Sequence, residues 1–226
     1  MNDSWHLTAS DQDDVVAQAE RVFDLVWRVD LGAPGFCLID LGTNTDSHAI
    51  RSSMVLLKNK LSEVGEFAFS FRSMGRFDQQ ETTKFHLDGA PAESMLILGY
   101  EPSTVRSRIF LADYCRCAFD LGIEPKQFLA EFNPMFRQGE EILSRYVTEM
   151  PQPQDGHFQL LLINNSSLPF TEERKNPLGV MHKAEIVNPN ESERRLVNSI
   201  MLMVGDTDEV GVDEFITTEK ISKKNY

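Results

Sequence analysis

The spacing of apolar residues in the first third of the chain is mostly that of α-helices. Across residues 11–27 they recur every three or four positions, and acidic side chains at the start of this stretch suit the positive end of a helix dipole. A second helical pattern covers about residues 47–63. Between them, residues 35–42 form a short apolar run bounded by glycines, which is typical of a buried strand. We therefore predict a mainly helical preface over residues 1–65.

Beyond the preface the pattern changes to that of β-strands. Residues 67–72 alternate large apolar side chains with small or polar ones, as a strand with one buried face does. Further strands are predicted at residues 82–87, 94–100, 157–163, 179–187 and 196–204. Residues 106–119 fit neither period clearly, and residues 124–146 follow the helical one apart from a break at Asn133-Pro134, so we predict a helical insert over about residues 106–150. The acidic stretch 205–226 is expected to be partly disordered.

The length and charge of the chain argue against several classes of protein. Its 226 residues suffice for one domain with a real core, since β-sandwiches and barrels reach this size as single units. A net charge of -13 without a basic cluster argues against nucleic-acid binding. No run approaches the roughly 20 apolar residues of a membrane span, and residues 1–14 lack the layout of a signal peptide. We expect a single cytoplasmic domain, residues 1–226, that binds neither nucleic acid nor membranes.

The cysteines fit a reducing compartment, because Cys37, Cys115 and Cys117 are few and odd in number. Cys115 and Cys117 form a C-x-C pair, but no second pair accompanies it, as a structural zinc site would require. We therefore expect all three residues to be buried thiols.

A candidate metal site begins with His86-Leu87-Asp88, at the end of a predicted strand. On an extended backbone residues two apart face the same side, so His86 and Asp88 can reach one ion while Leu87 packs on the other side. His182 lies 96 positions after His86 (182 − 86 = 96), on another predicted strand. It would supply a third ligand once the sheet folds back. Two imidazoles and one carboxylate suit ferrous iron and leave coordination positions open. A single H-x-D sequence is a weak indication of metal binding, because it also occurs where no metal is bound. The hypothesis of a metal site therefore depends on His182.

Arg194 and Arg195 follow His182 and open the apolar strand 196–204. A guanidinium group matches a carboxylate with two parallel hydrogen bonds. At this point the chain resembles the iron(II) and 2-oxoglutarate dependent dioxygenases, in which an H-x-D pair, a distal histidine and an arginine roughly a dozen residues later lie on a double-stranded β-helix, or jelly-roll. The resemblance covers most of the chain in layout. It implies that His86, Asp88 and His182 are the metal-binding and catalytic residues.

The same resemblance implies Fe(II) and 2-oxoglutarate as cofactors, molecular oxygen as a reactant, and hydrogen abstraction leading to hydroxylation of a small-molecule or amino-acid-type substrate. Arg195 would anchor the far carboxylate of 2-oxoglutarate, with Ser199 on the same strand face. Many members of the family carry a serine two positions after this arginine, whereas residue 197 is valine here, so Arg194 stays open as the anchor. Asp88 argues against a halogenase, in which a small residue typically replaces this carboxylate.

Two alternatives to the dioxygenase remain. One is a metal-dependent enzyme of the cupin type that does not use 2-oxoglutarate, although cupins usually carry more histidines near the first ligand. The other is a jelly-roll without catalysis that serves as a binding module. Asn164 and Asn165, which end an apolar strand, fit either a contact with a ligand or simple turn formation.

Overall fold

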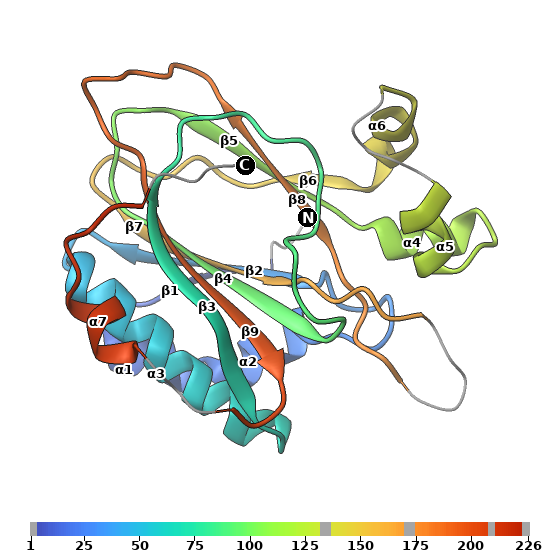
Figure 1. The fold of residues 1–226 in the computed structure, drawn as a ribbon, viewed down its shortest axis with the longest axis horizontal. Coiled ribbons are helices and arrows are strands. Elements are labelled where there is room, and N and C mark those ends of the chain that lie inside the picture. Colours follow the sequence, from blue (N-terminus) through green and yellow to red (C-terminus); the bar gives the residue numbers. More distant parts are fainter. Residues whose placement is uncertain (1–3, 132–136, 170–174, 208–210, 223–226) are drawn as a thin grey trace.

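The computed structural model describes residues 4–131, 137–169, 175–207 and 211–222. Within these residues the fold is β-rich, with two sheets and flanking helices (Figure 1). The strands are β1 (His6–Thr8), β2 (Phe36–Gly42), β3 (Phe69–Asp78), β4 (Ser94–Tyr100), β5 (Ser107–Ala112), β6 (Val147–Glu149), β7 (Phe158–Asn164), β8 (Met181–Ile186) and β9 (Leu196–Val204). The larger sheet has the order β1-β2-β7-β4-β9-β3, and the smaller sheet has the order β6-β5-β8. Only the β1–β2 pair of the described ladders is parallel.

Helices cover the outer face of the larger sheet (Figure 1). They are α1 (Gln12–Ala17), α2 (Ala19–Val26), α3 (Ser47–Gly65) and α7 (Val212–Thr217). Asp46 caps α3 by accepting a hydrogen bond from the backbone of Ala49, and the buried stripe of this helix, including Ile50 and Met54, packs on the sheet. The predicted helix over residues 11–27 is divided at Gln18, whose side chain donates to the carbonyl of Thr8. None of the described helices combines the length and the apolar character of a membrane span.

The inner face of the larger sheet packs against the smaller sheet. Leu38 and Leu161 of the larger sheet meet Leu111 of β5, and all three side chains are buried. Successive residues of a strand point to opposite faces, so this packing aligns one face of β4, β7 and β9 with the interior between the sheets. The candidate metal site lies in this interior.

The predicted helical insert over residues 106–150 is only partly helical. It contains α4 (Tyr114–Asp120), α5 (Pro125–Glu131) and α6 (Arg137–Leu143), but β5 and β6 lie at its two ends and pair with each other. The strands form because alternate residues such as Leu111 are buried between the sheets, which resolves the mixed period of residues 106–119. The predicted break at Asn133-Pro134 lies outside the described residues. The acidic C-terminal stretch contains α7, whose Phe215 is buried beside α3.

The predicted strand at residues 82–87 is reduced to an isolated bridge between His86 and His182. The hydroxyl groups of Thr82 and Thr83 accept hydrogen bonds from the backbone N–H groups of Ile186 and Ala184. The Thr83 N–H donates to the Ala184 carbonyl, but the bonds that β8 donates go to threonine hydroxyls instead of backbone carbonyls, so the segment follows β8 without becoming a regular strand.

Candidate metal centre

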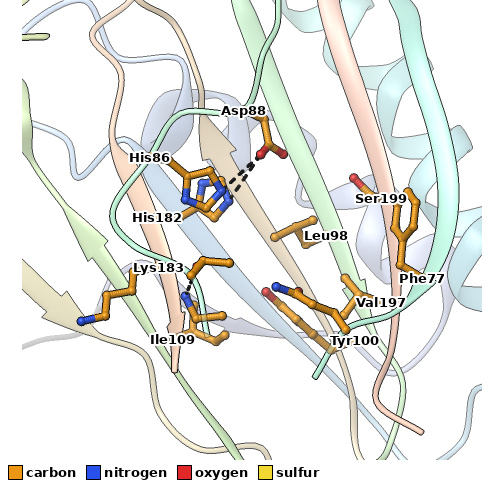
Figure 2. Close-up of a pocket in the computed structure, with 13 residues that line it drawn as sticks. Phe77, His86, Asp88, Leu98, Tyr100, Ile109, His182, Lys183, Val197 and Ser199 are labelled. Carbon is orange, nitrogen blue, oxygen red and sulfur yellow. Dashed lines mark hydrogen bonds and ion pairs between the residues drawn. The ribbon is translucent and has the colours of Figure 1, made fainter. Parts of the chain in front are cut away.

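Three side chains that the sequence pattern singles out, His86, Asp88 and His182, lie together in the structure. One ligand atom from each lies within 4.8 Å of the others. The distance from Asp88 Oδ1 is 3.3 Å to His86 Nε2 and 3.9 Å to His182 Nε2. Figure 2 shows both imidazoles turned toward the carboxylate, and their ring centroids are 4.2 Å apart.

Backbone pairing explains how residues so distant in sequence meet. His86 and His182 exchange two backbone hydrogen bonds, of 3.1 and 3.0 Å, which makes them directly opposed residues of an antiparallel bridge. Opposed residues point to the same face, so one bridge places both imidazoles side by side. Asp88, two positions beyond His86, returns to that face.

The tautomer of His86 suits metal binding. Its Nδ1 lies 2.6 Å from the carbonyl oxygen of Lys84. Because a carbonyl only accepts hydrogen bonds, Nδ1 carries a proton, which leaves Nε2, the atom that faces Asp88 and His182, as the nitrogen available to a metal. Metal-binding histidines typically have one nitrogen held by an outer carbonyl or carboxylate in this way.

The donor set fits a divalent transition metal. An ion about 2.1 Å from each nitrogen and oxygen keeps its ligand atoms roughly 3 to 3.5 Å apart. The His86–Asp88 distance already has this value, and the His182–Asp88 distance of 3.9 Å requires only a small side-chain movement. Two nitrogens and one oxygen are the donors expected for non-haem ferrous iron.

Asn165 fixes the backbone of Asp88, a role that sequence reasoning did not identify. Its side-chain oxygen accepts from the Asp88 N–H at 2.9 Å, and its amide nitrogen donates to the Asp88 carbonyl at 3.1 Å and to Ser94 Oγ at 3.0 Å. Asn165 is buried, whereas Asn164 beside it bonds the carbonyl of Val26. Asn165 therefore contacts the ligand-bearing segment through its backbone, and the only sequence signal is two asparagines directly after an apolar strand.

The triad opens onto a cavity between the sheets, which we call the metal pocket (Figure 2). Its other lining residues are Phe77, Gln79, Thr83, Leu98, Tyr100, Ile109, Lys183, Ala184, Val197 and Ser199. Ser199 and Val197 thus share the face of β9 that borders the pocket. The cavity volume is about 30 Å³, which is room for about two water molecules.

Arg195 lies behind Tyr100. The guanidinium carbon is 5.2 Å from the centre of the Tyr100 ring, and the group donates to Ser107 Oγ at 2.9 Å and to the backbone oxygen of Gln79 at 3.2 Å. The Arg195 side chain is buried, whereas that of Arg194, the residue before it, is exposed. Arg195 is therefore the arginine on the interior face.

Tyr100 separates the two ends of this interior. Burial raises the pKa of the phenol, and Arg195 offsets only part of this effect, so the hydroxyl stays protonated near neutral pH. On the other side of Tyr100 lies a second cavity of about 780 Å³, which we call the far cleft. It is bordered by Tyr100, Ile109, Arg194, Arg195 and the loops around residues 102–107 and 150–157.

The cysteines are buried free thiols, as expected. Burial raises the pKa of Cys37 and Cys115 to about 12 and that of Cys117 to about 11. Thiols with these values are protonated at neutral pH and are poor nucleophiles and poor metal ligands. The cluster of potential metal ligands among the described residues is the His86, Asp88 and His182 triad.

Neither a protein-family model nor a curated protein sequence matches this chain. Among solved structures, the chain is similar to one described as the crystal structure of asparagine oxygenase. The two share 9% sequence identity with a TM-score of 0.46, over 89% of this chain and 93% of that chain. At this level of similarity, the functional conclusion depends on the residues of the site.

Proposed function

We propose that this chain is a non-haem iron(II) and 2-oxoglutarate dependent dioxygenase that hydroxylates a small-molecule or amino-acid-type substrate. The observation that carries the proposal is the convergence of His86, Asp88 and His182, with the Nδ1 proton of His86 held by a backbone carbonyl. These residues would hold iron on one face and leave its other positions to exchangeable ligands. Bound iron together with 2-oxoglutarate supplies the oxygen activation that C–H hydroxylation needs.

The order of the strands supports a double-stranded β-helix as the core. The run β3-β9-β4-β7 forms one antiparallel layer, and β6-β5-β8, extended by the bridge at His86, faces it. Two facing antiparallel sheets are the arrangement of a jelly-roll. In such a core the segment with His86 and Asp88 lies directly beside the strand that carries His182.

Arg195 is our candidate for the residue that binds the far carboxylate of 2-oxoglutarate. It is a buried cation next to Tyr100, and Ser199 supplies a hydroxyl on the same face of β9. The metal pocket of about 30 Å³ is too small for 2-oxoglutarate, so binding requires that the ring of Tyr100 or the side chain of Gln79 moves. Because its phenol is protonated, Tyr100 would then donate a hydrogen bond to a carboxylate.

The closed pocket favours a second candidate, a metal-dependent enzyme that does not use 2-oxoglutarate. In this structure Arg195 is engaged with Ser107 and Gln79 and borders the far cleft. An enzyme of this kind would use the triad and the walls of the metal pocket alone, with Arg195 stabilising the fold.

The test is an anaerobic titration of the purified chain with ferrous iron, followed by 2-oxoglutarate. We expect iron binding and then a weak visible charge-transfer band, and both should be lost in Asp88→Ala and His182→Ala. Arg195→Ala should retain iron and lose most of its affinity for 2-oxoglutarate, while the matched control Arg194→Ala should behave as the unmodified chain. A positive result justifies a substrate screen by succinate release.

Each other outcome of this titration is informative. Iron binding without the charge-transfer band contradicts the dioxygenase and leaves the enzyme without 2-oxoglutarate. A folded protein that does not bind iron refutes both candidates. A loss of 2-oxoglutarate affinity in Arg194→Ala, but not in Arg195→Ala, would move the anchor to Arg194.

A further inference from the structure

The metal pocket and the far cleft share a wall of two side chains. Tyr100 and Ile109 line both cavities, and within the described part of the chain the two linings have no other residue in common. Figure 2 shows both side chains on the side of the metal pocket away from Asp88. A movement of either side chain would therefore change the size of both cavities.

The metal pocket can gain volume at this wall. Its volume of about 30 Å³ holds about two water molecules, whereas the far cleft has about 780 Å³. Protein interiors are packed about as densely as organic crystals, so a side chain moves most easily into space that is already empty. Tyr100 and Ile109 border such a space. Displacement of one of them into the far cleft enlarges the metal pocket without repacking of the core.

The strand register places Tyr100 between the two cavities. β4 lies between β9 and β7, and Tyr100 is directly opposite Val197 on β9 and Gln159 on β7. Directly opposed residues of neighbouring strands share a face of the sheet. Val197 lines the metal pocket and Gln159 lines the far cleft. A turn of the Tyr100 ring from the β9 side to the β7 side would therefore transfer volume from the far cleft to the metal pocket.

Tyr100 suits this movement better than Ile109. Ile109 is β-branched, which restricts rotation about its first side-chain bond. It also lies inside β5, where it is paired with Ala184 of β8 and its carbonyl accepts from the Met150 N–H. Tyr100 is the last residue of β4, and two rotatable bonds carry its ring.

The far cleft offers an apolar surface to the turned ring and to a ligand. Leu161 lies two residues beyond Gln159 on β7, so it is a diagonal neighbour of Tyr100 and within reach of an aromatic side chain. Leu161, Leu38 and Met150 are buried and line the cleft. The volume of the cleft falls within the range of about 300–1,000 Å³ found for ligand pockets. A ligand tail that passed Tyr100 would therefore meet apolar side chains with room to extend.

We propose that Tyr100 sets how long a ligand the metal centre accepts, and that the turned ring opens the metal pocket to the far cleft. The ligand class is 2-oxo acids with an apolar tail, bound through the keto acid end at the triad and with the tail in the far cleft. The keto acid end rests on the proposed function, whereas the place of the tail rests on the two cavities and their shared wall.

The first test is an anaerobic titration of the iron-loaded full chain with 2-oxobutanoate, 2-oxohexanoate and 2-oxooctanoate, followed by the charge-transfer band. 2-Oxoglutarate is the reference ligand. A buried methylene group contributes up to about fourfold in affinity, so we expect 2-oxooctanoate to bind at least about tenfold more tightly than 2-oxobutanoate. A tail that points into solvent would leave the affinity independent of its length.

The second test follows the Tyr100 ring in the chain labelled with 3-fluorotyrosine, by fluorine NMR with zinc(II) in place of iron. Tyr100→Phe identifies the Tyr100 resonance among the four tyrosines. We expect this resonance to shift when 2-oxooctanoate binds. The resonance of Tyr114 should not shift, because Tyr114 lines neither cavity and its hydroxyl donates to the Ser166 carbonyl.

Two variants separate the wall from the pocket. Tyr100→Ala removes the ring and with it the cost of turning it, so the affinity for 2-oxooctanoate relative to 2-oxobutanoate should rise at least about threefold. Leu98 lines the metal pocket but not the far cleft. Leu98→Ala should therefore change the affinities for both ligands by the same factor.

The measurements on the unmodified chain decide the proposal even if a variant fails to fold. Equal affinities along the series, with 2-oxoglutarate bound, overturn the far cleft as the site of the tail and leave the proposed function intact. Rising affinities with an unmoved Tyr100 resonance overturn the role of Tyr100. If neither 2-oxoglutarate nor any member of the series binds to the iron-loaded chain, the proposed function fails and this inference fails with it.

Discussion

Replacing Asn165 with alanine should weaken metal binding although Asn165 is not a ligand. The substitution removes the three hydrogen bonds that hold the Asp88 backbone and Ser94. Asp88 would keep its carboxylate, but the segment that carries it would move more freely beside β8. Outer groups that orient metal ligands typically contribute about tenfold to a hundredfold in metal affinity, and we expect a loss of this size.

Asn164 offers a matched control. It is also fully buried, and its side chain bonds the Val26 carbonyl and the Ser166 N–H, both at 3.0 Å. At about 1 kcal/mol for each neutral hydrogen bond, Asn165→Ala should lower the free energy of unfolding by about 3 kcal/mol and Asn164→Ala by about 2 kcal/mol. Both substitutions remove the same side-chain atoms and leave a void of the same size. The two variants therefore differ mainly in their effect on the position of Asp88.

The assay combines urea unfolding of the metal-free chain with competition titration of ferrous or cobalt ions against a chelator. We expect both variants to lose stability and only Asn165→Ala to lose metal affinity. Unchanged affinity in Asn165→Ala would refute the role assigned to its amide group. An equal loss in Asn164→Ala would show that metal binding follows overall stability and not the position of Asp88.

Three further predictions concern residues outside the site. Arg28 is buried and its guanidinium group bonds the carboxylate of Asp113 at 2.6 Å. Arg28→Met leaves this carboxylate without its cation, so the free energy of unfolding measured in urea should fall by about 3–5 kcal/mol. A loss below about 1 kcal/mol would contradict this prediction. Burial would raise the pKa of Glu101, but hydrogen bonds from arginine, serine and asparagine side chains outweigh burial, and the net effect is a lowered pKa. Its stabilisation is therefore complete above the unfolded pKa of about 4.3 and is lost as the pH falls through the lower folded pKa, so Glu101→Gln should show a shallower acid dependence of unfolding than the unmodified chain. Cys37, Cys115 and Cys117 should resist iodoacetamide at neutral pH until the chain is unfolded, and mass spectrometry showing rapid labelling of the native protein would disprove their burial.

The elements that sequence reasoning predicted best are those whose own residues are sufficient to define them. The strands at residues 94–100 and 196–204 are continuous apolar runs between polar or turn residues, and the structure has the same bounds. By contrast, β3 extends through the polar residues up to Asp78, because pairing with β9 continues beyond the apolar stretch. The prediction of a strand at residues 82–87 was wrong, because N–H groups of β8 bond threonine hydroxyls instead of backbone carbonyls of this segment. The spacing of apolar residues does not reveal such a substitution.

The same division applies to the site. The common orientation of His86 and Asp88 follows from local geometry, since residues two apart on extended chain share a face. The approach of His182 depends on one backbone bridge across 96 positions, and sequence alone supplies only the residue types. The position of Tyr100 under Arg195 depends on the register of three strands, which is why neither the closed metal pocket nor the far cleft was foreseen.

Two of the three candidate ligands, His86 and Asp88, lie on an irregularly paired edge of the smaller sheet. Residues 82–88 follow β8 through threonine hydroxyls, one hydrogen bond from the Thr83 N–H to the Ala184 carbonyl, and the backbone bridge between His86 and His182, so this edge is paired less regularly than β5 with β8. An ion bound by His86, Asp88 and His182 would cross-link the edge segment to β8, and its binding free energy would add to the stability of the paired state. Asn165 approaches Asp88 from the larger sheet, so the same ion would also couple the two sheets through one carboxylate. Metal binding and closure of the pocket between the sheets would therefore be linked, because both depend on where residues 86–88 lie.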